Sequence, residues 1–352
     1  ADQPSIWGQG IASELSATID WVVVAEEGIW GADDDTDIEY MYQELLYISR
    51  EIVLSPKKIR DAWIKHIKLE EENFLWVSNQ KAFDLMNDGV LPPETSDPTL
   101  NEHYDMIDAQ LTTEIFGVLS PINYKNALKM SNLPIRTTAR GDAALISEFY
   151  VIIHSLASTI DLNEPLDEEL IRISDFASSI LDENSYSFPM YEFVKSKFKS
   201  GITWEQTRDS IYQRYQVDQK DGYDITSRNL YCNGCFASGI NFAASLVSYF
   251  YGKGDFKETI KIATLSGWDS DNPASTWGGL LGFVHGKDEI EKIFNKSMSS
   301  SYNIHRTRQN FKNNGIDDFR NMSMKGIDIV NNVVKKTGGI VDQKNNKWII
   351  KN

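Results

Sequence analysis

The sequence predicts an all-α protein that forms one compact domain over residues 1–352. Apolar residues recur at spacings of three and four along much of the chain, which is the period of an amphipathic helix. Residues that favour helix starts stand before several of these stretches. No internal repeat and no linker-like segment divides the chain, and a hydrophobic content of 41% is enough for a large core.

The first two predicted helices follow an acidic segment near the start of the chain. An apolar stripe at helical spacing begins at Ile38. Thr36 is expected to cap this helix, and Glu39 is expected to reach back to it and complete a capping box. Ser55 then caps a second helix with Pro56 as its first residue, a position where proline is favoured.

The middle of the chain is predicted to be mostly helical. Prolines make residues 88–103 a loop. Thr203 and Gln206 form another capping box, and the strongly apolar segment 236–251 is expected to be a buried helix. Further helical stretches are predicted at about 104–118, 122–131, 140–160 and 165–181.

The two ends of the chain differ from this pattern. Residues 1–30 form an atypical N-terminal segment, and residues 335–352 form a C-terminal tail in which we expect a small hairpin. The chain begins at Ala1 without an initiator Met, which fits either a mature end after signal removal or the boundary of an expressed piece. Asn295 and Asn321 begin glycosylation sequons, so an extracellular location is expected, with a cytoplasmic one as the alternative.

The composition excludes several classes of function. The net charge is −16, so nucleic acid is not an expected partner, because binding it needs clustered Lys and Arg. No apolar run is long enough to span a bilayer, so no membrane partner is expected. The only cysteines, Cys232 and Cys235, are a poor zinc site, and a local disulfide and two free thiols remain open.

Two acidic clusters carry most of the functional information, and each lies where a helix should begin. One is Asp33-Asp34-Asp35, and the other is Asp269-Ser270-Asp271-Asn272, where Asn272 is a good N-cap. Unpaired N–H groups at a helix start favour carboxylates, so a cap or a solvated charge is the simplest explanation of either cluster alone. Five clustered aspartates nevertheless repel one another unless a cation lies between them. Hard oxygen ligands of this kind suit Mg²⁺, Mn²⁺ or Ca²⁺.

Small residues fill the helix that is predicted after the second cluster. Gly278, Gly279, Gly282 and Gly286 would each weaken a helix interior. We therefore expect a neighbouring helix or a ligand to approach this helix closely.

These features resemble the ADP-ribosylglycohydrolase family, over most of the chain between about Trp30 and Gly286. That family pairs an early Thr-Asp-Asp-Thr-like motif with a late Gly-x-Asp-Thr-Asp motif followed by a helix of small residues. Here the late motif reads Gly267-Trp268-Asp269-Ser270-Asp271-Asn272, and Tyr251-Gly252-Lys253-Gly254-Asp255-Phe256 is similar to the turn that precedes it. The resemblance implies a compact helical fold with a metal cleft.

The resemblance also implies a reaction and a site. It implies metal-dependent hydrolysis of an ADP-ribosyl bond, with ADP-ribose or an ADP-ribosylated molecule as partner and two Mg²⁺ ions, or Mn²⁺, as cofactor. Either Asp35 or Asp269 is the expected general base. The implied metal ligands are Asp33, Asp34, Asp35, Asp269, Asp271 and Asn272, and the implied substrate contacts are Gln110, Glu114, Gly117 and Trp268.

Three departures from the family pattern keep a second hypothesis open. Asp33 stands where a metal-binding Thr is frequent, and Asn272 stands where Thr or Ser is frequent. The Gly-rich opening helix that ends in a Glu near the ligand is missing; Glu14, Glu26 and Glu27 are its candidate substitutes. The alternative is therefore a non-catalytic ADP-ribose binder or a crystallin-like structural protein on the same fold. The sequence does not decide the leaving group or the oligomeric state.

Overall fold

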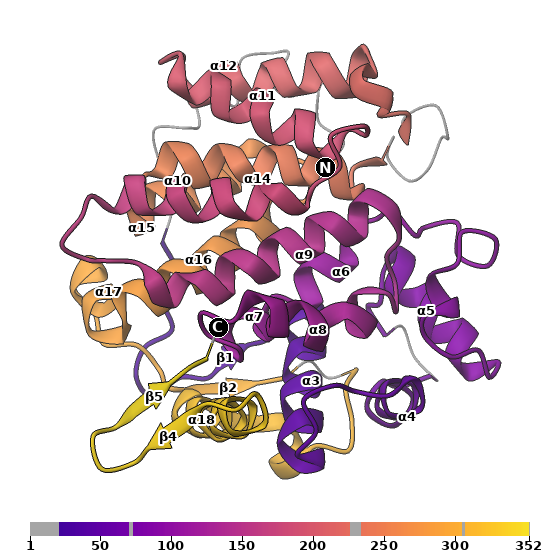
Figure 1. The fold of residues 1–352 in the computed structure, drawn as a ribbon, viewed down its shortest axis with the longest axis vertical. Helices are drawn as coiled ribbons and strands as arrows, with labels where there is room; N and C mark the ends of the chain where they lie inside the picture. Colours follow the sequence, from indigo (N-terminus) through magenta and orange to yellow (C-terminus); the bar gives the residue numbers. More distant parts are fainter. Residues whose placement is uncertain (1–20, 70–72, 226–233, 305–306, 352) are drawn as a thin grey trace.

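The computed structural model describes residues 21–69, 73–225, 234–304 and 307–351, apart from the side chains of Asp34 and Asp35. Helices account for most of these residues, so the predicted all-α class is confirmed (Figure 1). Within the described part, no helix is both long enough and apolar enough to cross a bilayer.

The first half of the chain forms one side of the molecule. Its helices begin directly after the short strand β1 (Trp30–Gly31). They are α3 (Asp34–Ser49), α4 (Pro56–His66), α5 (Val77–Asn87), α6 (Asp108–Thr112), α7 (Ile115–Val118), α8 (Tyr124–Ile135) and α9 (Gly141–Leu156), with short 3₁₀ turns at Glu94–Ser96 and Ala157–Thr159.

The second half of the chain supplies the helices in the upper part of Figure 1 and the C-terminal elements below them. The helices are α10 (Leu166–Ala177), α11 (Ser187–Lys199), α12 (Trp204–Ile211), α14 (Ser238–Gly252), α15 (Phe256–Ser266), α16 (Asp271–His285), α17 (Lys287–Phe294) and α18 (Phe319–Lys336). A π-helical turn spans Tyr212–Val217, and 3₁₀ turns span Ser178–Ile180, Lys220–Gly222 and Lys312–Gly315.

Helix α14 belongs to the larger apolar cluster of the two that dominate the described core. Every residue of α14 except Tyr251 is buried, as the apolar run at 236–251 predicted. It packs against α9, α11 and α15, and Trp277 of α16 is fully buried beside it, with its Nε1 donating to the Ser245 carbonyl at 2.9 Å. A second cluster joins α3, α4, α5, α7 and α18. Because α7 also packs on α9, the two clusters meet at this pair of helices.

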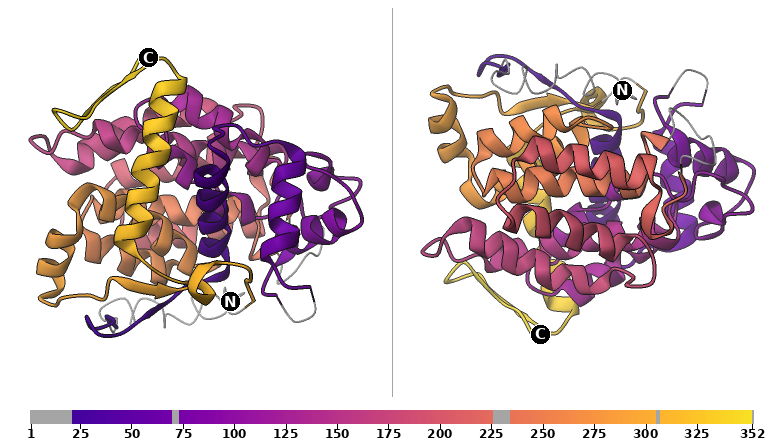
Figure 2. Two further views of the ribbon diagram at one scale, coloured as in Figure 1. Left: turned by 90° about the horizontal axis from the view of Figure 1, so that it is seen from below. Right: turned by 90° about the horizontal axis from the view of Figure 1, so that it is seen from above.

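Two small sheets lie at the surface. In the first, β1 pairs in parallel with β2 (Ser301–Asn303), and β2 pairs antiparallel with β3 (Ile316–Asp318). The second is a hairpin of β4 (Ile340–Asp342) and β5 (Lys347–Ile349), which confirms the hairpin predicted in the C-terminal tail. Figure 2 shows the hairpin leaving the end of α18 and projecting beside the body.

Several predicted helix boundaries are confirmed and others are wrong. Ser55 caps α4 through the amide of Lys58, and the capping box of Thr203 and Gln206 is present. The predicted helix at 104–118 is instead two short helices, α6 and α7, separated at Thr113 and Glu114. Both short helices pack on α8 and α9, and α6 also packs on α3 and α5, which the single stripe of one continuous helix would not reach as easily.

The first acidic motif also begins its helix earlier than predicted. Helix α3 starts at Asp34, and the carbonyl of Asp33 already accepts the amide of Asp37 at 3.3 Å. Thr36 therefore lies inside the first turn, where its hydroxyl donates to Asp33 Oδ2 at 3.4 Å. The prediction of Thr36 as the cap was wrong, because the aspartates themselves suit the positive end of the helix dipole.

Candidate functional site

Glu39 is the first residue whose position the sequence did not reveal. It was predicted to complete a capping box, but its Oε1 instead accepts the backbone amide of Ile115 at 2.8 Å. Burial raises the pKa of Glu39 to about 7; the Ile115 amide opposes this shift and the nearby charge of Asp33 adds to it. Glu39 thus lies between the first acidic motif and helix α7.

Glu114 links this group to the second motif. Its Oε2 accepts the hydroxyl of Thr276 at 3.2 Å, and Thr276 is a buried residue of α16. Burial, followed by the charge of Glu39, raises the pKa of Glu114 well above its ordinary value, while the bond from Thr276 lowers it. Electrostatic interactions therefore link Asp33 to Glu39 and Glu39 to Glu114, and a hydrogen bond links Glu114 to Thr276, five residues after Asp271.

The second motif is held in a tight turn between α15 and α16. Gly267 ends α15 with a φ of +90°, and Trp268 follows with a φ of +55°, which is uncommon for a bulky residue. The amide of Asp269 donates to Asn241 Oδ1 of α14 at 3.0 Å, and this hydrogen bond ties the turn to α14. Helix α16 then begins at Asp271, so Asn272 lies inside its first turn and was wrongly predicted as the cap.

Asp269 carries the strongest electrostatic signal in this turn. Burial raises the pKa of Asp269 to about 8, and the charge of Asp271 and a hydrogen bond with that residue add to the rise. The charge of Asp108 raises it further, and a hydrogen bond with Asn272 opposes it. Burial combined with neighbouring carboxylates favours the protonated form of Asp269.

Asp108 is a second residue that sequence reasoning left out of the site. It begins α6 and is almost fully buried, and its Oδ1 accepts the amide of Asn79 of α5 at 2.9 Å. Burial is the main cause that raises the pKa of Asp108 to about 6. Because Asp108 acts on the charge of Asp269, the 108–118 segment faces the second motif at Asp108 as well as at Glu114.

The described part of the chain tests the predicted metal ligands only in part. Asp33 is exposed, Asp271 is exposed and Asn272 is buried. Among the described side chains, no group of three or more His, Cys, Asp or Glu residues is arranged to hold a metal ion. Asp34 and Asp35 have side chains outside the described part, so the predicted ligand set of both motifs stays a prediction.

The predicted substrate contacts differ in their surroundings. Gln110 is buried, and its Oε1 has no hydrogen-bond partner in the described part of the chain, which leaves an acceptor for a ligand or water. Trp268 is buried within the larger apolar cluster. Gly117 has a packing role, because an added Cβ would lie 2.3 Å from the Val151 carbonyl oxygen. Substrate contact by these three residues stays a prediction.

The glycines of α16 do not serve the close packing that we expected. An added Cβ on Gly278 would come no nearer than 3.5 Å to Ile260, and on Gly279 and Gly282 it would meet no described atom within 4 Å. Gly286 ends the helix with a φ of +76°, as glycine often does. The expectation of close approach by a neighbouring helix was therefore wrong for the described part of the chain.

The one described cysteine takes the oxidised form. Cys235 is disulfide-bonded, so of the two forms left open by the sequence the structure contains the disulfide. Cys232, the only other cysteine in the sequence, lies outside the described residues.

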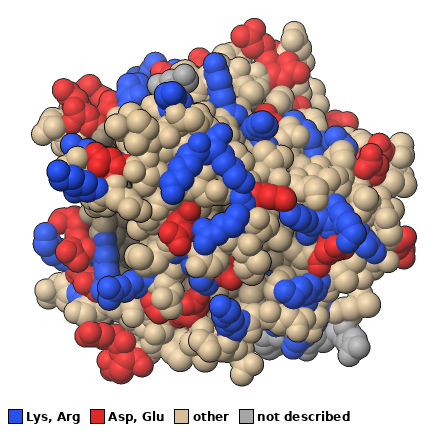
Figure 3. Space-filling model, turned by 60° about the horizontal axis from the view of Figure 1, so that its bottom comes forward, with Lys and Arg blue, Asp and Glu red and all other residues tan. Residues whose placement is uncertain are grey.

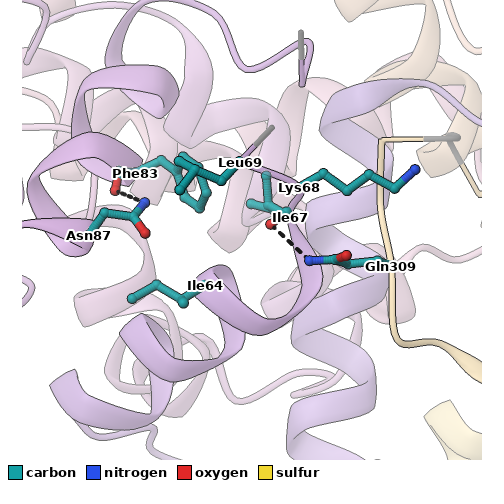
Figure 4. A pocket seen from close by; sticks show the side chains of 7 residues that line it. All are labelled: Ile64, Ile67, Lys68, Leu69, Phe83, Asn87 and Gln309. Atoms are coloured by element: carbon teal, nitrogen blue, oxygen red, sulfur yellow. Dashed lines mark hydrogen bonds between the residues drawn. The ribbon is translucent and has the colours of Figure 1, made fainter. Parts of the chain in front are cut away.

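A separate cavity of about 570 Å³ lies beside α4 and α5 (Figure 4). Two amide side chains on its wall are tied to the backbone, Asn87 to the Phe83 carbonyl at 2.9 Å and Gln309 to the Ile67 carbonyl at 3.4 Å. The lining residues are Ile64, Ile67, Lys68, Leu69, Phe83, Asn87 and Gln309. No residue predicted for the functional site is among them.

Comparison with known proteins agrees with the motifs. The sequence model of the ADP-ribosylglycohydrolase family matches residues 6–303, which is most of the chain. No significant match was found among curated proteins. The matched region includes both acidic motifs and the segment that links them, and it ends before β3, α18 and the hairpin.

Proposed function

The chain belongs to the ADP-ribosylglycohydrolase family, and we propose that it hydrolyses the ADP-ribosyl glycosidic bond of a substrate that binds between its two acidic motifs. The observation that carries this proposal is the position of Glu114, which contacts Thr276 of α16 directly and acts electrostatically on Glu39 of α3. This arrangement brings the helices of both motifs to one buried polar segment. Family membership supports glycoside hydrolysis in general, and the motifs support the metal-dependent form.

The donor set fits a pair of divalent cations, which we propose to be Mg²⁺, with Mn²⁺ as a substitute. Burial and, after it, the charge of Asp271 raise the pKa of Asp269, and a cation bound there would favour the ionised carboxylates. Oxygen donors alone suit these hard ions. The proposed ligands are Asp33, Asp34, Asp35, Asp269, Asp271 and Asn272. When bound, the ions would lower the pKa of a bound water and hold the ribose hydroxyls.

The chain's own residues would supply the proton transfer and the charge stabilisation. Asp35 or Asp269 would accept the proton of the attacking water as general base. The carboxylates of the two motifs would also stabilise the positive charge that develops at the anomeric carbon. Glu114 and Gln110 would position the ribose, because each places an acceptor oxygen on the linking segment and ribose hydroxyls donate to such oxygens.

A panel of substrates tests the proposal most directly. ADP-ribosyl-arginine, ADP-ribosyl-serine and soluble ADP-ribosyl compounds are incubated with the protein, with Mg²⁺, with Mn²⁺ and with a chelator, and released ADP-ribose is quantified. We expect release from at least one substrate only when a metal is present. No release from any substrate would contradict hydrolysis. Metal-dependent stabilisation by ADP-ribose without cleavage would instead identify a binder.

We also propose an extracellular location, on the basis of the disulfide at Cys235 and the two sequons. Asn295 and Asn321 are both exposed, so glycans could be attached there without disturbing the core. The mass of protein from its native host, measured before and after reduction and deglycosylation, tests this. Two free thiols and an unmodified mass would contradict it.

A further inference from the structure

The C-terminal segment has the opposite charge to the rest of the chain. Residues 304–352 contain ten Lys and Arg and four Asp, which gives a net charge of +6. Because the whole chain has a net charge of −16, residues 1–303 have a net charge of −22. This segment begins where the family match ends. Its basic character is therefore an addition to the matched region, and it calls for a reason other than the proposed reaction.

Helix α18 displays this charge beside the far end of α3 (Figure 2). Lys325 contacts Glu44 near the start of the contact between the two helices. At the other end, Lys336 Nζ and Asn332 Nδ2 both donate to the carbonyl of Arg50, the latter at 2.8 Å. The two helices thus run in the same direction, with cationic residues at their C-terminal ends.

Four cations gather at this end, and we call them the basic face: Arg50, Lys335, Lys336 and Lys351. All four are exposed, and none forms an ion pair with an acidic side chain in the described part of the chain. Lys351 belongs to the group because its Cδ lies 4.0 Å from the position of a Cβ on Gly338, just after α18. Figure 3 shows Lys and Arg side chains gathered over the middle of this side of the molecule.

Large apolar side chains protrude around the basic face. Ile48, the last residue but one of α3, is 70% exposed. Ile340 and Ile349 are paired across the hairpin and are 56% and 53% exposed, so one face of the hairpin is apolar and open to solvent. Burying each of these side chains would be favourable by about 1.5–3 kcal/mol, and exposed apolar residues that are grouped in this way are typical of an interaction surface.

The same surface continues along the outer side of α18. Met324 and Ile327 are exposed there, one helical turn apart. Trp348 of the hairpin is partly exposed and donates from Nε1 to Asn331 Oδ1 at 2.8 Å, which places it one turn beyond Ile327. Because side chains alternate along a strand, Trp348 lies on the face of the hairpin toward α18, and Ile340 and Ile349 lie on the outer face. The basic face is therefore flanked by exposed apolar residues of α18 and by the outer face of the hairpin.

We propose that this surface binds peripherally to an anionic lipid surface. Lysines and arginines would contact the headgroups while the protruding isoleucines of the hairpin enter the interfacial layer, the combination by which peripheral proteins bind membranes. The proposal does not depend on the proposed hydrolysis. The sequence excluded a membrane partner because no segment can span a bilayer, and peripheral binding needs no such segment.

Two other occupants fit the surface less well. A symmetric dimer would bring the same patch of each copy together, so the four cations would face four cations. A folded acidic protein would need hollows that match protruding side chains from three separate elements, whereas a fluid headgroup layer adapts to them. The acidic remainder of the chain does not prevent contact, because charges farther than about 10 Å from the surface are largely screened at physiological salt.

Vesicle co-sedimentation of the full chain tests the proposal. We expect binding to phosphatidylcholine vesicles that contain phosphatidylserine, loss of binding at high salt, and no binding to phosphatidylcholine alone. The variant with Lys335→Glu and Lys336→Glu should bind at least about tenfold more weakly, because each basic residue near an anionic surface strengthens binding about fivefold. The variant with Ile340→Ser and Ile349→Ser should also bind more weakly.

The matched control carries Lys197→Glu and Lys199→Glu on α11, on the opposite side of the molecule (Figure 1). It makes the same change in charge and should retain full binding. Thermal unfolding of every variant confirms that the fold is intact. Absence of binding to phosphatidylserine vesicles at low salt overturns the proposal and leaves an acidic protein as the occupant. An equal loss in the α11 control overturns it too.

Discussion

The two ends of helix α3 differ in charge and in burial. At its N-terminal end, Asp33 acts on the buried carboxyl of Glu39, and that carboxyl accepts a backbone amide of α7. At its C-terminal end, about 24 Å away by helix geometry, Arg50 joins three lysines on an exposed surface. The helix dipole favours each arrangement, because it attracts anions to the start of a helix and cations to its end.

The difference shows what each end is suited to do. Glu39 and Asp269, which lie near the starts of α3 and α16, carry raised pKa values, so they gain from a cation and can exchange protons. Cations spread over an exposed helix end keep their charge and attract an anionic surface. One helix thus connects a candidate reaction site to a candidate docking surface, and each can be disrupted without the other.

The largest effect is expected at the acidic end, from Asp271→Asn. The substitution keeps the size of the side chain and removes one ligand charge, so turnover should fall by about 10²–10³, the range seen when one electrostatic stabiliser is lost. Steady-state assays across Mg²⁺ concentrations measure it. Asp288→Asn, an exposed change on α17, is the control and should leave activity unchanged. An equal fall in both variants would contradict the assignment.

The next largest effect is expected where α18 joins α3, from Lys325→Met. Lys325 contacts both Glu44 and Asp317, and all three side chains are mostly buried. Removing the cation leaves two carboxylates facing each other, which should lower the free energy of unfolding by about 3 kcal/mol. Urea denaturation measures the loss. Lys344→Met, at an exposed lysine, is the control. If it destabilises the protein as much, the contacts of Lys325 with Glu44 and Asp317 do not stabilise the packing of α18 on α3.

Gly117→Ala should loosen the segment that links the two motifs. The added Cβ would lie 2.3 Å from the Val151 carbonyl oxygen and 2.7 Å from His154 Cβ, and neither the backbone nor a Cβ can move away freely. We expect a loss of about 2 kcal/mol of stability from overpacking, together with reduced activity. Gly279→Ala on α16, where space is open, should be neutral or slightly stabilising. Equal effects in the two variants would show that this packing does not position Glu114.

The buried carboxyl groups near the two acidic motifs should make the stability of the protein depend on pH. The pKa values of Glu39 and Asp269 are raised to about 7 and 8, so the folded protein binds more protons than the unfolded chain as pH rises from 6.5 to 8. Stability in chelator should therefore fall by about 1–2 kcal/mol across this window. The buried His154, whose pKa is lowered to about 4, acts mainly below the window, where stability rises with pH.

Thermal unfolding at several pH values with a chelator, and again with Mg²⁺, measures this dependence. Mg²⁺ should reduce the loss, because a bound cation keeps the carboxylates ionised. If the protein in chelator becomes more stable as pH rises from 6.5 to 8, the carboxyl groups of Glu39 and Asp269 are not protonated in the folded state.

The smallest effect is expected from Asn272→Thr, which installs a residue that is frequent at this position in the family. Asn272 is buried in the first turn of α16, and threonine retains an oxygen donor of similar reach. Activity should stay within about threefold of the parent or rise, since a change in one pocket contact is usually worth about 1 kcal/mol. A loss as large as that of Asp271→Asn would show that the amide itself is required.

The sequence alone determined the helical class, the hairpin and both acidic motifs. Periodicity and capping are local, so Ser55, Thr203 and Gln206 predicted their contacts correctly. The partners of Glu39 and Glu114 were decided only by the tertiary structure. Glu39 contacts the amide of a residue 76 positions away, and Glu114 contacts Thr276, 162 positions away. No local pattern encodes such pairs, because they depend on how α7 packs against α9 and brings α3 and α16 to one segment.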